Sequence, residues 1–382
     1  MNRLPGLDLL RAIAIIWVML FHSFVVGGLG ESYGWLSDYG WMGVDLFFVL
    51  SGYLIGSQVL KPLSRGESPG FGDFYLRRVF RIVPAFLATI ALYAWWPAFR
   101  EYEGLQPVWQ FLTFTVNLLI DYQHNKAFSH AWSLCVEEHF YLVFPWLAWW
   151  LTRRPSMAKF LVVSLGLLAA GMALRGYVWL HDLAPLRGAG GAERSFGLSY
   201  IEDIYYPTWM RLDGLLAGVV LATVKAYRPS WWARMQARSN VLLLGGLVVT
   251  AASIWMFRER FDLLPTVVGY PLLSAGLASL VVAGAGTQSV IGRWRIPGAG
   301  WVALISYSLY LTHKAAMHLT QTWFGTQLEG QGLLAFAVYS AAVLLMGALL
   351  HYTVEGPFLR LREWLLLRRQ AAAAVPELSR TL

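Results

Sequence analysis

The chain of 382 residues is 57% hydrophobic but only 14% charged, whereas about a quarter of the residues in a soluble domain are charged. This deficit of charge excludes an ordinary soluble protein, and apolar stretches of about 20 residues, the length that crosses a bilayer, recur along the sequence. The net charge of +8 does not indicate nucleic-acid binding, because the lysines and arginines lie in short loops between these stretches. Cys135 is the only cysteine, which excludes an intramolecular disulfide and a multi-cysteine metal site.

The first apolar stretch, 7–27, is expected to be a retained membrane span. It contains Asp8, Arg11 and His22 and has no small-residue cleavage site, which argues against a signal peptide. Arg11 and His22 are separated by eleven helical steps of about 100°, which places them on one helix face with an axial separation of about 16 Å. With a cytoplasmic N-terminus, Arg11 lies near the cytoplasmic end of the span and His22 lies in its outer half.

Ten spans are predicted from the apolar stretches and the residues that flank them. Their ranges are 7–27, 40–60, 79–99, 130–151, 157–180, 208–226, 240–257, 265–285, 301–324 and 331–353. When both termini are cytoplasmic, every strongly basic loop faces the cytoplasm, as the positive-inside rule requires. The predicted fold class is therefore all-α, a polytopic transmembrane helical bundle.

One further segment, 108–120, is apolar but short. Counting it as a crossing would place the basic loop from Arg153 to Lys159 outside, so we expect a re-entrant or interfacial helix. Such a helix must be covered by protein or line a water-filled cavity. The membrane domain is expected to cover 1–369, and the alanine-rich segment 370–382 is expected to be a disordered tail.

Ionisable side chains recur inside the predicted spans, where they are costly and usually face a cavity or mark a site. They are Asp8, Arg11, His22, Asp45, Glu137, Glu138, His139, Arg211, Asp213 and His313. Together with Arg77, Arg78 and Arg81 at the start of the third span, Arg11 forms an inner zone suited to phosphates. The deeper histidines and carboxylates form a second zone suited to proton transfer.

The gap between the two zones is comparable to the length of a pantetheine arm. We therefore expect a cytosolic acyl-coenzyme A to dock its nucleotide on the arginines and to extend its thioester toward His22. The sequence contains no glycine-rich phosphate loop and no zinc-type histidine motif. Acyl-coenzyme A, with acetyl-coenzyme A the first choice, is thus expected as a co-substrate, and no bound metal or cofactor is expected.

Six segments resemble, in order, the bacterial membrane acyltransferase-three family, which includes O-acetylases of lipopolysaccharide and exopolysaccharide and acylases of macrolide sugars. The segments are LDLLRAIAIIWVMLFHS at 7–23, GVDLFFVLSGYLI at 43–55, FYLRRVFRIVPAF at 74–86, HAWSLCVEEHFYLVFP at 130–145, RLDGLLAG at 211–218 and SYSLYLTH at 306–313. The resemblance implies a multi-pass enzyme of the bacterial inner membrane. It would transfer an acyl group, most often acetyl, to a hydroxyl of a sugar, glycan or glycolipid acceptor. Some relatives carry a periplasmic hydrolase-like domain that this sequence lacks, so any outer step is expected to be completed in the membrane domain or by a partner.

The resemblance also assigns residues to roles. The family's motif of arginine, ten residues and histidine falls on Arg11 and His22, its RxxR motif falls on Arg78 and Arg81, and the glutamate of its WSLxxExxFY motif falls on Glu137. We expect His22 to act as a general base or a transient acyl carrier, and Glu137 to orient or charge-balance the imidazole. The alternative for His22 is a purely structural hydrogen bond between helices.

Other residues stay open between function and structure. The four arginines either bind the donor phosphates or set the topology at span ends. Further residues either line the acceptor path or serve packing, and these are Asp45, Asp213, His313, Trp132 and Ser133. For the two aspartates, the structural alternative is an ion pair with Arg11 or Arg211. Glu137, Glu138 and His139 follow one another at helical steps of about 100°, so they cannot all face one cavity.

Two other function classes compete with acyl transfer. A proton-coupled transporter of a polar or acidic solute would use the intramembrane histidines and carboxylates as a relay, but the sequence shows no repeated pair of interrupted spans. A scaffold in a polysaccharide assembly complex predicts that His22 and Glu137 tolerate replacement. The sequence does not name the acceptor, because the loop 181–207, which would set specificity, carries no recognisable motif.

Overall fold

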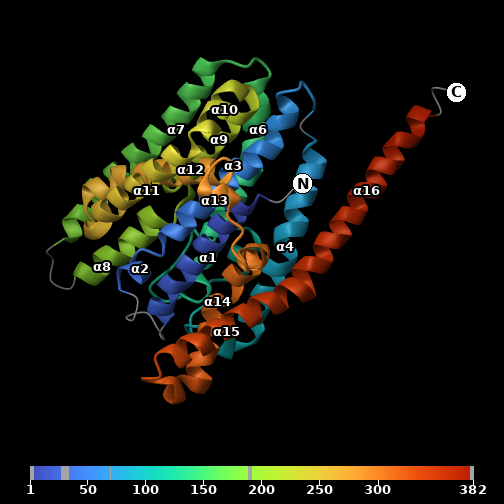
Figure 1. Ribbon diagram of the computed structural model, residues 1–382. Helices are drawn as coiled ribbons and strands as arrows, with labels where there is room; N and C mark the ends of the chain where they lie inside the picture. Colours follow the sequence, from blue (N-terminus) through green and yellow to red (C-terminus); the bar gives the residue numbers. More distant parts are fainter. Residues whose placement is uncertain (1–3, 27–33, 69, 188–191, 379–382) are drawn as a thin grey trace.

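The computed structural model describes residues 4–26, 34–68, 70–187 and 192–378, and Figure 1 shows that this part of the chain is a bundle of helices. Within these ranges there is no β-strand, and the only bridge joins Leu105 to Ala127. The all-α prediction is confirmed for the described part of the chain.

Each of the ten predicted spans coincides with a helix. These helices are α1 (Pro5–Val26), α3 (Met42–Leu63), α4 (Phe71–Trp95), α6 (Trp132–Thr152), α7 (Met157–Val178), α9 (Asp213–Tyr227), α11 (Ser239–Met256), α12 (Tyr270–Gly284), α14 (Ala299–Leu328) and α15 (Leu333–Leu350). The shorter helices are α2 (Trp35–Asp38), α5 (Val108–Leu112), α8 (Ala192–Ser199), α10 (Pro229–Ala237) and α13 (Val290–Arg293).

Seven segments of the described chain are long and apolar enough to cross a membrane, and they contain α1, α3, α4, α7, α11, α12 and α15. Helix α9 has only 15 residues, and α6 and α14 are long enough but less apolar. Some of the polar side chains that lower the hydropathy of α6 and α14, such as Glu137, Glu138 and Lys314, line the cavities described below. The number of crossings and the orientation of the termini stay predictions.

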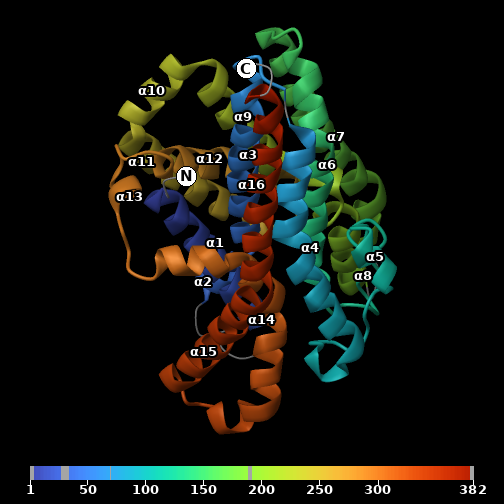
Figure 2. The same ribbon diagram turned by 90° about the vertical axis from the view of Figure 1, so that its right-hand side faces the viewer.

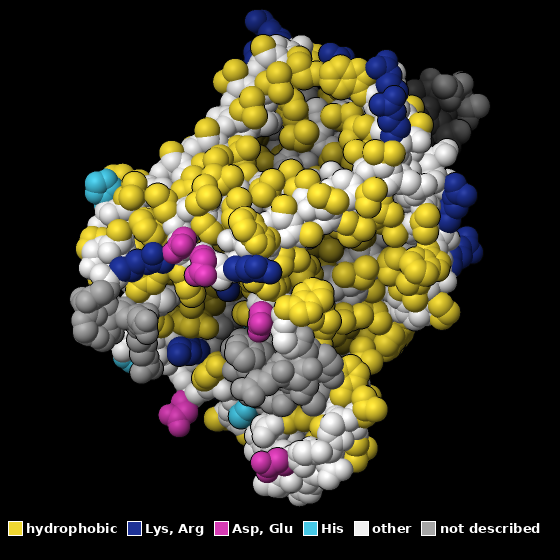
Figure 3. Space-filling view, turned by 60° about the vertical axis from the view of Figure 1, so that its left-hand side comes forward, with side chains coloured by type: hydrophobic (Ala, Val, Ile, Leu, Met, Phe, Trp, Pro, Cys, Tyr) yellow, Lys and Arg dark blue, Asp and Glu magenta, His cyan; other side chains and the backbone are white. Residues whose placement is uncertain are grey.

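The surface of the bundle is hydrophobic, as a lipid-facing surface must be. Val162 and Leu165 of α7 and Val241 and Leu244 of α11 are all exposed. Figure 3 shows a broad apolar face on which the acidic side chains lie in the lower half, whereas lysines and arginines also reach the upper end. The apolar helices and this surface together describe a multi-pass membrane protein.

Helix α3 lies at the centre of the bundle and packs against α1, α6, α9 and α12. Its contact with α9 depends on glycines, because a Cβ atom at Gly52 would lie 2.2 Å from the Leu215 carbonyl oxygen and one at Gly218 would lie 2.2 Å from that of Val49. Small residues allow membrane helices to approach this closely. On its other side, α1 packs against both α3 and α14, which brings His22 of α1 against His313 of α14.

The segment 108–120 does not form the single helix that its apolar sequence predicted. Helix α5 ends at Leu112, and Phe114 has a φ of 56°, a left-handed conformation that no continuing helix accepts. Asn117 is fully buried and donates hydrogen bonds to the Tyr206 carbonyl oxygen and to the Thr208 hydroxyl. Protein therefore covers the irregular backbone at Asn117, whereas Leu112, Leu118 and Leu119 of the same segment are exposed.

The end of the chain also differs from the prediction. Helix α16 (Gly356–Leu378) continues from α15 through the turn His351–Glu355 and lies along α4, as Figure 2 shows. It includes residues 370–378, which were predicted to be disordered. The helix continues there because the segment follows an established helix and is rich in alanine, the residue with the highest helix propensity. The rest of the predicted tail, 379–382, lies outside the described residues.

Candidate functional site

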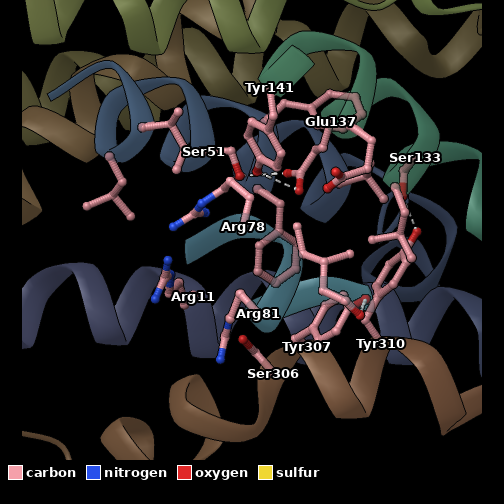
Figure 4. Close-up of a pocket in the computed structure, with 18 residues that line it drawn as sticks. Arg11, Ser51, Arg78, Arg81, Ser133, Glu137, Tyr141, Ser306, Tyr307 and Tyr310 are labelled. Carbon is pink, nitrogen blue, oxygen red and sulfur yellow. Dashed lines mark hydrogen bonds between the residues drawn. The ribbon is translucent and has the colours of Figure 1, made fainter. Parts of the chain in front are cut away.

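A cavity of about 120 Å³ lies between α1, α3, α4, α6 and α14. We call it the arginine cavity, because Arg11, Arg78 and Arg81 all line it, together with Glu137. Figure 4 shows the three guanidinium groups on one side of this space, with Tyr310 on the opposite side. The structure thus brings together the arginines that the two motifs singled out, although they come from different helices. Arg77 is not among the residues that line the cavity.

The three arginines differ in how their charge is compensated. Arg81 donates to Glu355 on the turn before α16, and Glu355 also accepts hydrogen bonds from Ser308 at 2.6 Å and His351 at 2.8 Å. Among the described residues, no carboxylate lies within ion-pair distance of Arg11 or Arg78. The Nε atom of Arg78 is buried without a hydrogen-bond partner. Positive charge is therefore available for an anion in this cavity.

Glu137 belongs to the arginine cavity and is held there by two hydroxyl groups. Ser51 donates to its Oε1 at 2.6 Å and Tyr141 donates to its Oε2 at 2.9 Å (Figure 4). The prediction that Glu137 orients or charge-balances the His22 imidazole therefore fails, since both oxygens have other partners and His22 is not part of this cavity. Glu138 lines the same cavity, whereas His139 turns away to the Thr208 hydroxyl at 2.7 Å.

A second cavity, of about 110 Å³, contains His22 and His130, and we call it the histidine cavity. Its wall also includes Trp132, Tyr205 and Arg260. The loops that enclose it are those that precede α3 and α6, precede α9 and follow α11. These are the loops that the predicted orientation places outside the membrane.

The partner of His22 is His313. His22 Nδ1 lies 2.8 Å from His313 Nε2, and His313 Nδ1 lies 2.8 Å from the Tyr310 carbonyl oxygen. A carbonyl oxygen only accepts, so the hydrogen-bond partners assign the proton of His313 to Nδ1 and leave its Nε2 as an acceptor. His22 then donates from Nδ1, and its Nε2 is left with a free lone pair. His313 is fully buried behind His22.

Three groups in or beside this cavity were missed by sequence reasoning. The His130 ring centroid lies 5.9 Å from that of His22 and 5.0 Å from that of His313, and its Nδ1 has no hydrogen-bond partner. Lys314 lines the cavity and forms a 2.7 Å ion pair with Glu101. Lys314 lies in the predicted span 301–324, so the rule that flags ionisable residues in spans would have found it. His130 is the first residue of the matching segment 130–145, but no role was predicted for it. No sequence signal placed Glu101 next to Lys314.

The remaining predicted residues fall into two groups. Asp45 accepts from Arg211 at 2.8 Å, and Asp213 pairs with Arg175 at 2.8 Å, so both aspartates are parts of buried ion pairs. Arg211, the partner of Asp45, is one of the two arginines that the structural alternative named, whereas Arg175, the partner of Asp213, was not predicted. Neither aspartate is among the residues that line the two cavities.

Trp132 and Ser133 are neighbours in sequence but face different cavities. Trp132 lines the histidine cavity, where its ring stacks on Tyr206 with a centroid separation of 5.1 Å. Ser133 lines the arginine cavity, where its Oγ lies 2.6 Å from the Tyr310 hydroxyl oxygen. Tyr310 and Val44 line both cavities, so they form the wall between them.

The sequence model of the acyltransferase-three family, described as an acyltransferase domain, matches residues 4–352. This chain belongs to that family. The match runs from the start of α1 to the turn after α15 and so includes every helix that contributes to the two cavities.

Curated relatives are similar over most of the chain. It is 26% identical to the peptidoglycan O-acetyltransferase OatA of Listeria monocytogenes, over 83% of this chain and 50% of that protein. It is also 26% identical to the putative peptidoglycan O-acetyltransferase YrhL of Bacillus subtilis, over 83% of this chain and 49% of that protein. It is 23% identical to a putative O-acetyltransferase of Staphylococcus aureus strain COL, over 94% of this chain and 58% of that protein. The chain thus spans about half the length of these relatives, and no solved structure matches it significantly.

Proposed function

We propose that this protein is an integral membrane O-acyltransferase that moves an acetyl group from cytosolic acyl-coenzyme A to a glycan hydroxyl in a bacterial inner membrane. The observation that carries the proposal is the pair of cavities that meet at Tyr310. One cavity offers two guanidinium groups, those of Arg11 and Arg78, which have no ion-pair partner among the described residues, and the other offers an imidazole with a free nitrogen. The names of the curated relatives make peptidoglycan the first acceptor to test.

The donor occupies the arginine cavity in this proposal. Arg11 and Arg78 bind its phosphates, because guanidinium forks match phosphate oxygens and neither side chain has a carboxylate partner among the described residues. Arg81 contributes positive charge while Glu355 fixes its position. The thioester then points toward Ser133 and Tyr310, on the far side of the cavity from the guanidinium groups (Figure 4).

The acceptor hydroxyl enters the histidine cavity and meets His22 Nε2. The imidazole takes the hydroxyl proton while the hydroxyl oxygen attacks the thioester carbonyl. The C–S bond breaks, coenzyme A leaves as a thiolate, and the thiolate takes up the proton from His22. His313 holds the His22 ring in the tautomer that this step needs, because His313 Nε2 accepts a hydrogen bond from the Nδ1–H of His22. Acyl transfer requires the contact between Tyr310 and Ser133 to open.

Lipid-reconstituted protein with radiolabelled acetyl-coenzyme A and peptidoglycan glycan strands tests the proposal. The wild type should label the strands, and His22→Ala should lower the rate by about 10²–10⁴, the usual contribution of a general base. Full transfer by a folded His22→Ala protein would overturn the catalytic assignment. If the labelled donor is not consumed but the strands become acetylated from another donor, the acyl-coenzyme A part of the proposal is wrong.

A further inference from the structure

Arg260 lies in the wall of the histidine cavity, just after the turn Phe257–Glu259. Its guanidinium carbon lies 4.5 Å from the Trp41 ring centroid and 4.7 Å from that of Tyr205. The Nε atom is buried and has no hydrogen-bond partner. Aromatic faces thus hold this guanidinium group, and no carboxylate lies within ion-pair distance of it among the described residues.

Arg260 takes part in none of the surrounding ion pairs of the described chain. Asp213 pairs with Arg175, and Asp45 pairs with Arg211 through Oδ1, whereas Asp45 Oδ2 has no hydrogen-bond partner. Three arginines therefore share two aspartates in this layer of the bundle. Lys314, the other cation in the cavity wall, is neutralised by Glu101. Among the described residues that line the cavity, Arg260 is thus the cation without an ion-pair partner, and an unpaired charge that is partly buried is costly unless a ligand compensates it.

The rest of the wall suits a sugar ring. Aromatic side chains supply flat apolar surfaces on which the C–H faces of a pyranose pack, and these are Trp41, Tyr122, Trp132, Tyr205 and Tyr206. Ser129 and the two imidazoles add hydrogen-bonding groups among them. Ligand sites combine apolar walls and a few placed polar groups in this way.

We propose that the histidine cavity selects an acidic sugar and that Arg260 binds its carboxylate. One uncompensated guanidinium group matches one monoanionic carboxylate, which it can bind through two parallel hydrogen bonds. The carboxylate would fix the sugar so that a neighbouring hydroxyl meets His22 Nε2. This inference rests on the proposed function for the identity of the reacting hydroxyl, but Arg260 can be tested through binding alone.

The experiment uses the full chain in lipid nanodiscs and two matched ligands. One is peptide-free glycan strands of peptidoglycan, whose muramic acid residues carry free carboxylates, and the other is the same strands after conversion of these groups to neutral methylamides. The wild type should bind the carboxylate strands about tenfold to a hundredfold more tightly, the size of one charge-assisted hydrogen bond. Arg260→Gln should bind both forms as weakly as the wild type binds the neutral one. Arg258→Gln, which removes the same charge from an exposed neighbour, should behave like the wild type.

A second variant separates recognition from folding. Arg260→Lys keeps the charge and the contact with the aromatic rings but loses the planar fork, so it should retain a reduced preference for the carboxylate strands. Equal binding of both strand forms by the wild type would overturn the inference. An equal loss of affinity for both strand forms in Arg260→Gln, at an unchanged melting temperature, would also overturn it, since Arg260 would then only pack in the cavity wall.

Labelled acetyl-coenzyme A added to the same samples separates this inference from the proposed function. Arg260-dependent preference without any acetyl transfer would contradict the proposed function and support the inference. Transfer to both strand forms at equal rates, with equal binding, would support the proposed function and contradict the inference.

Discussion

The arginine cavity and the histidine cavity lie on opposite sides of one tyrosine, but they hold charge in different ways. In the arginine cavity, Arg11 and Arg78 face Glu137 without pairing to it. In the histidine cavity, Lys314 is neutralised by Glu101 and the imidazoles are positioned by hydrogen bonds. Under the proposed function, donor phosphates bind in the arginine cavity and proton transfer takes place in the histidine cavity, so changes in one cavity should leave the other largely intact.

Breaking the buried ion pair beside the histidine cavity should have the largest effect. Both Lys314 and Glu101 have side chains that are almost completely buried. Glu101→Ala leaves the ammonium group with only the Ser129 hydroxyl as a partner, and we expect a loss of about 3–5 kcal/mol in the free energy of unfolding. Thermal unfolding in detergent measures this loss. The double variant Glu101→Ala with Lys314→Met, which removes both charges, should recover part of it, because the Tyr93 hydroxyl and the Phe128 N–H still lose the carboxylate as their acceptor.

The exposed pair between Arg187 and Asp262 is the matched control for that experiment. Its side chains are about half exposed, at 44% and 46%. Solvent screens such a pair, so Asp262→Ala should cost no more than about 1 kcal/mol. Equal losses for the buried and the exposed pair would show that burial of the Lys314 pair contributes nothing to stability.

Donor affinity should depend on the arginine cavity alone. Arg78→Gln and Arg11→Gln should each raise the KM for acetyl-coenzyme A by about tenfold to a hundredfold, because each removes a charge-assisted hydrogen bond to phosphate. The KM for the glycan should stay unchanged. Arg77→Gln, which changes a side chain outside the cavity, is the control. A rise in the glycan KM would mean that the two cavities do not have separate ligands.

The sequence predicted the arginine cavity better than the histidine cavity, and the reason is physical. Charge and depth selected Arg11 together with Arg77, Arg78 and Arg81, and the resemblance to the family's RxxR motif singled out Arg78 and Arg81. The helical fold of all ten apolar stretches was likewise predictable from length and composition. Whether Glu137 reaches His22 depends instead on the rotation and spacing of α1, α6 and α14, which only packing determines.

The errors follow from the same limit. Glu137 has two hydroxyl partners. One of them, Ser51, lies on a different helix at a position that no periodicity marks. The partner of His22 is His313 of α14, which was predicted only to line the acceptor path or to serve packing. Glu101 lies in a loop, where an acidic residue looks like an ordinary topological charge, and Phe114 ends a helix through backbone geometry that its own side chain does not signal.

A smaller effect should separate the two candidates for positioning His22. His313→Gln should lower kcat about tenfold with little change in the glycan KM, because the loss of one orienting hydrogen bond reduces the fraction of His22 in the reactive tautomer. Glu137→Gln should act on the donor instead and lower the KM for acetyl-coenzyme A, since it removes a negative charge that faces the phosphates. Steady-state kinetics with each substrate varied in turn distinguishes these outcomes. A tenfold fall in kcat for Glu137→Gln at unchanged donor KM would show that Glu137 positions His22 and does not act on the donor.

The smallest change tests the wall where the two cavities meet. The Tyr310 hydroxyl oxygen lies 2.6 Å from Ser133 Oγ and donates to the His130 carbonyl oxygen at 3.0 Å. Tyr310→Phe removes these contacts, so we expect a loss of only about 1 kcal/mol in stability and a severalfold rise in hydrolysis of acetyl-coenzyme A without acceptor, because water can then pass the wall. Tyr307→Phe is the control, since its hydroxyl donates to the Ile82 carbonyl oxygen and it lines the arginine cavity only. If both variants hydrolyse the donor equally, Tyr310 is not the barrier that keeps the thioester from water.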